Sequence, residues 1–311
     1  MCGVFGFVNL TKDNISLKAL RKVATKTEER GPHAYGMAWM DRNNELWWYK
    51  AEGKISENIE VLQMVKQAVV MVGHTRWATH GSPTDERNNH PHFTDKGAYV
   101  HNGVIRNAFD IAKSCNFEMQ TECDSEIIGQ LMDSAEGTVV DRIYTAVEDT
   151  TGPMVVAGIW ENSLVLVRKN KQPLKYFKNK KQLWFSSFGK HLLGKPEVFE
   201  DNSVQQFVFN RNLIDVKDKK SFVPDPVSIS KTERKKRREK KRNLFLPIVT
   251  SYDNTDSLYC LPEELPSCGI VLSSGQGWVE YIIPKDYEEE PVESLSAEFN
   301  HWIQERSLTT N

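Results

Sequence analysis

Cys2 directly follows the initiator methionine and precedes the apolar run VFGFV over residues 4–8, which predicts a buried strand. If Met1 is removed, Cys2 carries both a thiol and a free α-amine. A thiol is a good nucleophile, and an α-amine titrates at about 7.7–8.0, so it can act as a base near neutral pH. One residue would then supply two catalytic groups. The alternative is that Cys2 is only a small buried residue of the strand.

Cys2 lies in the first of six segments that follow one another along the chain: MCGVFGF, RGPHAYG, GHTRWATHGSP, NNHPH, VHNGVIRN and ECDSEII. Together they resemble the glutaminase domain of class II glutamine amidotransferases, and HTRWATHG is most similar to glucosamine-6-phosphate synthase. The resemblance covers roughly residues 2–216. It implies an α+β fold of the N-terminal-nucleophile hydrolase type, a four-layer αββα arrangement, with a small C-terminal extension. Periodicity alone predicts only an α+β protein.

The resemblance also implies roles for individual residues in the hydrolysis of glutamine to glutamate and ammonia through a Cys2 thioester. Asn102 and Gly103 match the family's oxyanion site, and a side-chain amide and a backbone N–H suit that role. Arg76 and Asp124 match its glutamine clamp, because a guanidinium binds a carboxylate and a carboxylate binds an ammonium group. An Asn-Gly turn and ordinary surface or structural charges remain the alternatives.

Other residues of these segments are expected to support the pocket or to depart from the family pattern. Trp77, Thr79, His80 and Gly81 are expected to form or support its wall. His33 stands where the family commonly has an acidic residue in the segment RGP. If that acid orients a neighbouring loop, then loop order or the rate would differ in this chain.

Histidines are concentrated in the same part of the chain, at positions 74, 80, 90, 92 and 101. The HPH segment could place two imidazoles on one face of a strand, which would suit a metal site. No acidic or thiol ligands occur at a recognisable spacing from them. We therefore expect no metal, and histidines that form hydrogen bonds in the loops around the pocket.

Composition limits the class of protein. The chain has 311 residues, of which 39% are hydrophobic and 26% charged, and a formal net charge of −2, so a wholly basic nucleic-acid binder is excluded. The five cysteines form no CxxC pair and predict reduced thiols in the cytoplasm. No apolar run approaches the roughly 18 residues of a membrane span, and no leader precedes the first strand. GxGxxG and P-loop motifs are absent, and we expect no cofactor.

The composition changes after Val216, where the resemblance ends. We expect a glutaminase domain over residues 1–216, a charged linker over 217–243, and a C-terminal extension of unknown role over 244–311. Residues 231–242 hold nine Lys or Arg among twelve residues. A solvated linker or helix face is the favoured interpretation of this run, and contact with nucleic acid or an acidic protein is the alternative.

The acceptor of the ammonia is not readable from the sequence. Amidotransferases of this class pass ammonia to a synthase domain, and the 95 residues after Val216 are too few for one. We therefore expect either a separate synthase subunit that docks on this chain or a free-standing glutaminase. The alternative function is a glutaminase-like domain that serves as a non-enzymatic binding or regulatory module.

Overall fold

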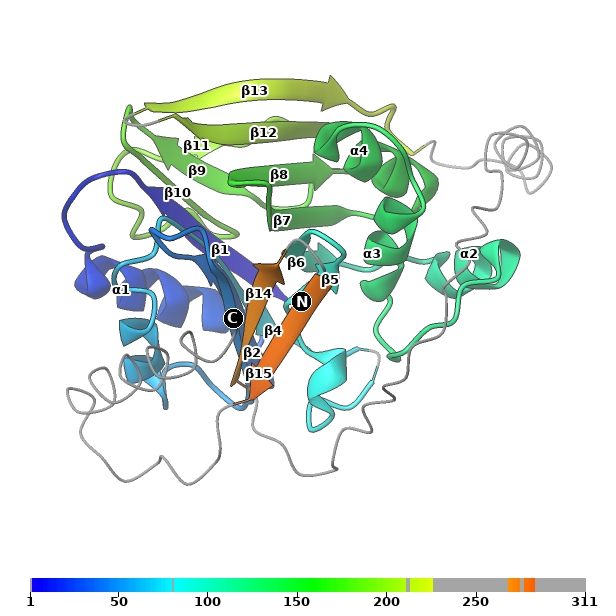
Figure 1. Ribbon diagram of the computed structural model, residues 1–311, viewed down its shortest axis with the longest axis horizontal. Helices are drawn as coiled ribbons and strands as arrows, with labels where there is room; N and C mark the ends of the chain where they lie inside the picture. Colours follow the sequence, from blue (N-terminus) through cyan, green and yellow to red (C-terminus); the bar gives the residue numbers. More distant parts are fainter. Residues whose placement is uncertain (1, 80, 211–212, 226–267, 275–276, 283–311) are drawn as a thin grey trace.

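Two antiparallel sheets face each other in the centre of the molecule (Figure 1). A computed structural model describes residues 2–79, 81–210, 213–225, 268–274 and 277–282, with the side chains of 210, 268–274 and 277–282 left aside. The first sheet has nine strands and the second has six. Every neighbouring pair of strands is antiparallel.

The order of the strands places the first strand of the chain in the interior of a sheet. The nine-stranded sheet runs, in spatial order, β11 (Glu197–Val198), β9 (Lys175–Lys178), β10 (Gln182–Ser186), β1 (Gly3–Asn9), β4 (Val70–Arg76), β2 (Ala34–Met40), β3 (Leu46–Glu52), β14 (Cys268–Ser274) and β15 (Gly277–Ile282). The six-stranded sheet runs β13 (Leu213–Ser221), β12 (Ser203–Asn210), β8 (Ser163–Lys169), β7 (Met154–Trp160), β6 (Gly97–Gly103) and β5 (His92–Thr94). The N-terminal strand β1 is therefore an interior strand with a partner on each side.

Helices cover the outer face of each sheet. The helices are α1 (Leu17–Glu28), α2 (Ala108–Cys115), α3 (Glu126–Asp133) and α4 (Val139–Asp149), with 3-10 turns η1 (Ile59–Gln63) and η2 (Glu86–Asn88). Helix α1 packs on the nine-stranded sheet, and α2, α3 and α4 pack on the six-stranded sheet. These layers confirm the expected αββα order. Among the described residues, no helix is both long and apolar enough to cross a membrane.

Side chains of β1 show how alternation divides the core. Val4 and Val8 belong to the apolar core between the two sheets, whereas Phe5 and Phe7 belong to the core beneath α1. Successive residues of a strand point to opposite faces, so a buried interior strand is apolar on both. Burial of all seven residues of β1 confirms the predicted N-terminal strand.

Most predicted elements of the first 216 residues are present, with small differences. Ser16 followed by Leu17, Leu20 and Val23 on one face predicts a helix through about Glu29. Helix α1 confirms it, and the Ser16 hydroxyl accepts a hydrogen bond from the backbone N–H of Ala19. The sequence also predicts a short helix near residues 57–66, where the structure has the 3-10 turn η1. Helix α2 was not predicted, although Ala108, Ile111 and Ala112 have helical spacing and are buried.

The fold continues beyond Val216, the expected end of the catalytic domain. That residue lies within β13, which pairs with β12 along its whole length. Phe222 is buried, and Asp225 forms an ion pair with Lys169. The hairpin of β14 and β15, from the expected C-terminal extension, adds to the edge strand β3. The basic run at 231–242, most of the expected linker and extension, and the helix expected near residues 295–306 lie outside the described residues.

Candidate active site

Three predicted site residues lie at the ends of strands that line the space between the sheets. Val72 of β4 and Val100 of β6 belong to the core between the sheets. By alternation, Arg76, four positions after Val72, and Asn102, two positions after Val100, face the same space. The pairing of Gly3 with Thr75 places Cys2 beside Arg76 at the adjoining ends of β1 and β4. The sheet order therefore brings the expected nucleophile to the expected clamp.

The thiol of Cys2 lies against the backbone of Trp77. The backbone N–H of Trp77 donates to Cys2 Sγ at 3.3 Å, and Sγ lies 3.6 Å from the carbonyl oxygen of Trp77. Arg30 Nε donates to the carbonyl oxygen of Cys2 at 2.7 Å, which fixes the backbone of this residue. Cys2 is thus held on both its backbone and its side chain before the first strand begins.

Burial dominates the ionisation of this thiol. It raises the pKa of Cys2 above its ordinary value, while the N–H of Trp77 and the positive charge of Arg76 act in the opposite direction and the carboxylate of Asp124 adds to the rise. Both proposed clamp charges are therefore close enough to act on the thiol. A thiol with a raised pKa is protonated at neutral pH, so it requires a base to become a nucleophile.

Asn102 lies next to the nucleophile strand through one serine. Its amide Nδ2 lies 3.4 Å from Ser187 Oγ, and the same hydroxyl accepts the backbone N–H of Val4 at 3.0 Å. The carbonyl oxygen of Asn102 accepts from Gln172 Nε2 at 3.2 Å. Asn102 is almost fully buried, at 1% exposure. A long contact to Ser187 leaves the amide group able to donate to a developing oxyanion.

Gly103, the next residue, lies where neighbouring atoms leave no room for a side chain. A Cβ atom at this position would lie 2.2 Å from the carbonyl oxygen of Pro153 and 2.8 Å from His101 Nε2. Real Cβ atoms do not approach other atoms so closely, so no larger residue fits without a shift of the backbone. The end of strand β6 thus requires glycine for a reason of packing.

Arg76 is buried, at 3% exposure, and its guanidinium group organises the loop that follows β4. It donates to Asn89 Oδ1 at 2.8 Å, to the carbonyl oxygen of Gly81 at 3.0 Å and to that of Ser82 at 3.2 Å. These three acceptors are neutral, so they orient the guanidinium group without neutralising its charge. A guanidinium group binds carboxylates through paired hydrogen bonds, which is the role expected for Arg76.

Asp124 is held by the segment that follows the expected oxyanion residues. Its Oδ2 accepts the backbone N–H of Ile105 at 2.6 Å, and the side chain is buried. Ile105 is two residues after Gly103. The hydrogen bond therefore ties the acidic half of the expected clamp to the expected oxyanion site.

His33, which stands where the family commonly has an acid, contacts the loop that follows β4. Its Nδ1 accepts the backbone N–H of Ala78 at 3.1 Å, and its ring lies 4.9 Å from that of Trp77. In this hydrogen bond the imidazole nitrogen is the acceptor, a part that a carboxylate oxygen can also play. The substitution thus preserves an acceptor for this loop.

The expected pocket wall is only partly defined. Trp77 is 45% exposed, and its backbone rather than its ring contacts Cys2. Thr79 is exposed, and His80 lies outside the described residues. Gly81 has a left-handed backbone conformation, with φ of 69°, and its carbonyl oxygen contacts Arg76. Trp77 contacts Cys2 and Gly81 contacts Arg76, whereas among the described residues Thr79 has no hydrogen bond to either.

Four of the histidines are buried together beside this site. The ring of His90 lies 4.0 Å from that of His74, 4.6 Å from that of His92 and 6.4 Å from that of His101. Burial, and then the neighbouring rings, lowers the pKa of His74 to about 3, and burial holds those of His90 and His92 well below their ordinary value. These rings are therefore neutral at pH 7.

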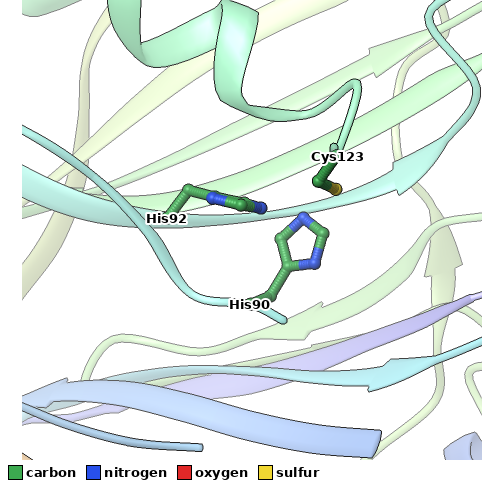
Figure 2. A group of neighbouring side chains, drawn as sticks. All are labelled: His90, His92 and Cys123. Carbon is green, nitrogen blue, oxygen red and sulfur yellow. The ribbon is translucent and has the colours of Figure 1, made fainter. Parts of the chain in front are cut away.

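Cys123 joins the histidines from another part of the chain (Figure 2). One ligand atom each of His90, His92 and Cys123 lies within 4.8 Å of the others. Burial raises the pKa of the Cys123 thiol to about 11, with a further contribution from Asp124. The sequence did not predict this thiol as a neighbour of the histidines, because Cys123 lies 31 residues after His92 in the chain.

Three supporting residues were not identified from the sequence: Asn89, Gln172 and Ser187. Asn89 belongs to the segment NNHPH, and Ser187 to the segment WFSSFGKHLL, in which the resemblance continues. Gln172 and Ser187 contact Asn102 from 70 and 85 residues away in the chain, whereas Asn89 contacts Arg76 from 13 residues away. Only the position of Asn89 directly before HPH offered a local signal.

Comparisons of the sequence with known proteins find relatives of part of the chain. No protein-family model matches the chain. The glutamine–fructose-6-phosphate aminotransferase of Helicobacter pylori is 30% identical over 221 residues, 66% of this chain and 36% of that protein. That of Rhizobium meliloti is 33% identical over 185 residues, 56% of this chain and 29% of that protein. The chain therefore matches only 29% to 36% of the length of these relatives.

Solved structures match the fold. Glutamine phosphoribosylpyrophosphate amidotransferase from B. subtilis, complexed with ADP and GMP, superposes with a TM-score of 0.60 at 18% identity, over 72% of this chain and 50% of that one. A structure described as the allosteric regulatory enzyme of purine biosynthesis superposes with a TM-score of 0.61 at 18% identity, over the same shares. These matches confirm the expected fold.

Proposed function

We propose that this chain, a homologue of class II glutamine amidotransferases, hydrolyses the side-chain amide of glutamine to glutamate and ammonia. The observation that carries the proposal is the position of Cys2, which the strand register places beside Arg76 while the backbone of Trp77 holds its thiol. A nucleophile placed next to a cation that can bind the α-carboxylate of an amino acid suits a small zwitterionic substrate.

The first half of the reaction forms a thioester. With Met1 removed, the α-amine of Cys2 takes the thiol proton, and Sγ attacks the side-chain carbonyl carbon of glutamine. The amide of Asn102 and the backbone N–H of Gly103 stabilise the oxyanion of the tetrahedral intermediate. The C–N bond then breaks, and the ammonium form of the amine returns its proton to the departing nitrogen, which leaves as ammonia.

The second half hydrolyses the thioester. The α-amine, again neutral, takes a proton from water, whose oxygen attacks the same carbonyl carbon. Asn102 and Gly103 stabilise the second oxyanion, the C–S bond breaks, and glutamate leaves as the proton returns to the thiol. The amine therefore acts twice as a base and twice as an acid, and the cycle needs no cofactor.

Substrate selection depends on the two buried charges on either side of the thiol. Arg76 binds the α-carboxylate of glutamine, and Asp124 accepts from its α-ammonium group. Both charges act on the pKa of Cys2, which supports their placement around one substrate. Trp77 and Gly81 belong to the wall of this pocket, and Thr79 and His80 are assigned to it on the resemblance alone.

The ammonia is proposed to serve an acceptor enzyme. The curated relatives are named as aminotransferases, and this chain matches 29% to 36% of their length. A synthase domain or subunit that accepts the ammonia would then supply the remaining chemistry. We place the reaction in the cytoplasm, a proposal that the free thiols of Cys2, Cys115 and Cys123 support.

The decisive experiment measures glutamate and ammonia released from glutamine by the full-length chain. Cys2→Ala should abolish release, and Cys115→Ser, which changes an exposed cysteine, should not. Acid quenching during turnover should trap a thioester on Cys2, detectable by mass spectrometry. Glutamine binding without turnover by a chain whose Met1 has been removed would instead identify a binding module and overturn the enzymatic proposal.

A further inference from the structure

His90, His92 and Cys123 meet in a buried cluster beside the candidate active site (Figure 2). His90 and His92 come from the segment that enters β5, and Cys123 from the loop that precedes α3. All three side chains point toward one another in Figure 2. We propose that these three residues bind a Zn²⁺ ion.

The donor set is of the kind that Zn²⁺ prefers. Imidazole nitrogens and a thiolate are its usual protein ligands, and thiolate selects against magnesium and calcium. In a tetrahedral site, Zn–N bonds of about 2.1 Å and Zn–S bonds of about 2.3 Å place the ligand atoms roughly 3.4–3.6 Å apart. The ligand atoms here lie within 4.8 Å of one another. Side-chain rotations that move these atoms by about 1 Å therefore bring them to the distances of a metal site. Three protein ligands leave the fourth position to water.

Unpartnered nitrogens support a ligand at this place. His90 is 3% exposed and His92 is 5% exposed. Both ring nitrogens of His90, and Nε2 of His92, make no hydrogen bond to any described protein atom. A buried polar atom without a partner costs about 1–3 kcal/mol, which is why such atoms usually have one. A coordinated metal ion satisfies one nitrogen of each ring.

Charges of both signs lie near the cluster. The positive charge of Lys50 acts on His92, whereas the carboxylate Oδ1 of Asp124 lies 4.0 Å from Cys123 Sγ. A Zn²⁺ ion with one thiolate carries a net positive charge, which this carboxylate offsets. Because neutral imidazoles and a thiolate are the forms that bind metal, binding displaces only the proton of Cys123.

The site would join the two loops that hold the proposed glutamine clamp, and this part of the inference rests on the proposed function. His90 directly follows Asn89, which accepts a hydrogen bond from Arg76. Cys123 directly precedes Asp124. One ion would therefore fix both halves of the clamp relative to each other, so its removal should raise the KM for glutamine more than it lowers kcat.

The test begins with metal binding to the full-length chain, purified with a chelator and then dialysed. Zn²⁺ should bind with a stoichiometry of one, measured by elemental analysis and by competition with a chromophoric chelator. Co²⁺ should give the absorption of a thiolate-to-cobalt charge transfer. Absence of both signals in the folded wild-type chain would overturn the proposal, as would selective binding of Cu⁺ without Zn²⁺.

Variants then locate the ion. Cys123→Ala and His92→Gln should each weaken Zn²⁺ binding by more than about a hundredfold, beyond what changes around a metal site typically cost. Cys115→Ser is the matched cysteine control. Cys2→Ala is essential because a terminal amine and thiol can themselves chelate Zn²⁺. Binding that disappears with Cys2→Ala and persists with Cys123→Ala would overturn the proposed site.

Binding and activity separate this inference from the proposed function. If Zn²⁺ binds through Cys123 but the chain releases no glutamate, the site stands and the enzymatic proposal fails. If the chain hydrolyses glutamine and binds no Zn²⁺, the enzymatic proposal stands and the site fails. Where both hold, Zn²⁺ should lower the KM for glutamine in the wild-type chain and leave it unchanged in Cys123→Ala.

Discussion

Replacement of Asp225 by alanine should strongly destabilise the domain, although this residue lies beyond the expected end of the catalytic unit. Its carboxylate lies 2.9 Å from Lys169 Nζ and also accepts the backbone N–H of Gly152 at 2.9 Å. Lys169 Nζ also donates to the carbonyl oxygens of Val147 and Thr150, at 3.1 and 2.7 Å. Lys169 therefore joins the end of β8 to the C-terminal end of α4, and Asp225 ties this junction to the segment that follows β13.

The size of the effect follows from the burial of the pair. Removal of one partner from a buried ion pair costs about 3–5 kcal/mol, because the other charge is left buried. The Lys169 side chain is 2% exposed but that of Asp225 is 27% exposed, so water replaces part of the interaction. We take about 2–3 kcal/mol for the pair, and about 3–4 kcal/mol once the bond to Gly152 is included. Typical domains unfold with about 5–15 kcal/mol in total.

Urea denaturation at pH 7.5, followed by tryptophan fluorescence, measures the free energy of unfolding. Asp215→Ala is the matched control, since it removes the same charge from β13 and should change the unfolding free energy by less than about 1 kcal/mol. The double variant Lys169→Met/Asp225→Ala should recover much of the loss, because an apolar side chain leaves no buried charge. If Asp225→Ala is no less stable than Asp215→Ala, the reasoning about this pair is refuted. Chains truncated after Val216, within β13, should fail to accumulate in folded form.

Three further predictions concern the candidate site. Arg76→Ala should raise the KM for glutamine by about ten- to a hundredfold with a smaller change in kcat, whereas Asn102→Ala should lower kcat by about a hundred- to a thousandfold; steady-state kinetics that reverse this division would exchange their roles. His33→Ala should raise the KM for glutamine, because Ala78 loses the acceptor of its N–H, and His33→Asp should restore it; equal kinetics in both variants would exclude the orienting role. Burial raises the pKa of the Cys2 thiol, so its iodoacetamide alkylation, followed by peptide mass spectrometry, should rise about tenfold per pH unit from pH 7 to 9, and a plateau below pH 8 would contradict this.

The sequence allowed the prediction of elements whose signal is local. Alternation and apolar runs identified β1, and the serine before an apolar periodic segment identified the start of α1. Helix α2 was missed because its apolar signal is weak: only Ala108, Ile111 and Ala112 of its eight residues are buried. Helix α3 has the same length but five buried residues. The opposition of two sheets came from the family resemblance, since periodicity does not specify which strands pair.

Candidate site residues could be predicted where they lie in a short segment that resembles a known family. Cys2, Arg76, Asn102 and Asp124 lie in segments that could be compared directly with a known family. The contacts of Ser187 could not be predicted, because the hydroxyl reaches Val4, 183 residues earlier in the chain. Cys123 had the same difficulty, since only the folded chain brings its thiol to the histidines.

The interior position of β1 sets an order of events during synthesis. This strand leaves the ribosome first, but its partner β10 and the hydroxyl of Ser187 are made about 180 residues later. At roughly 5–20 residues per second, that interval is about 10–40 s. During it, Cys2 has neither its second neighbouring strand nor the serine that joins that strand to Asn102. The nascent chain therefore carries the proposed nucleophile without its surrounding site, and we expect chemistry at Cys2 to begin only after most of the chain has emerged and folded.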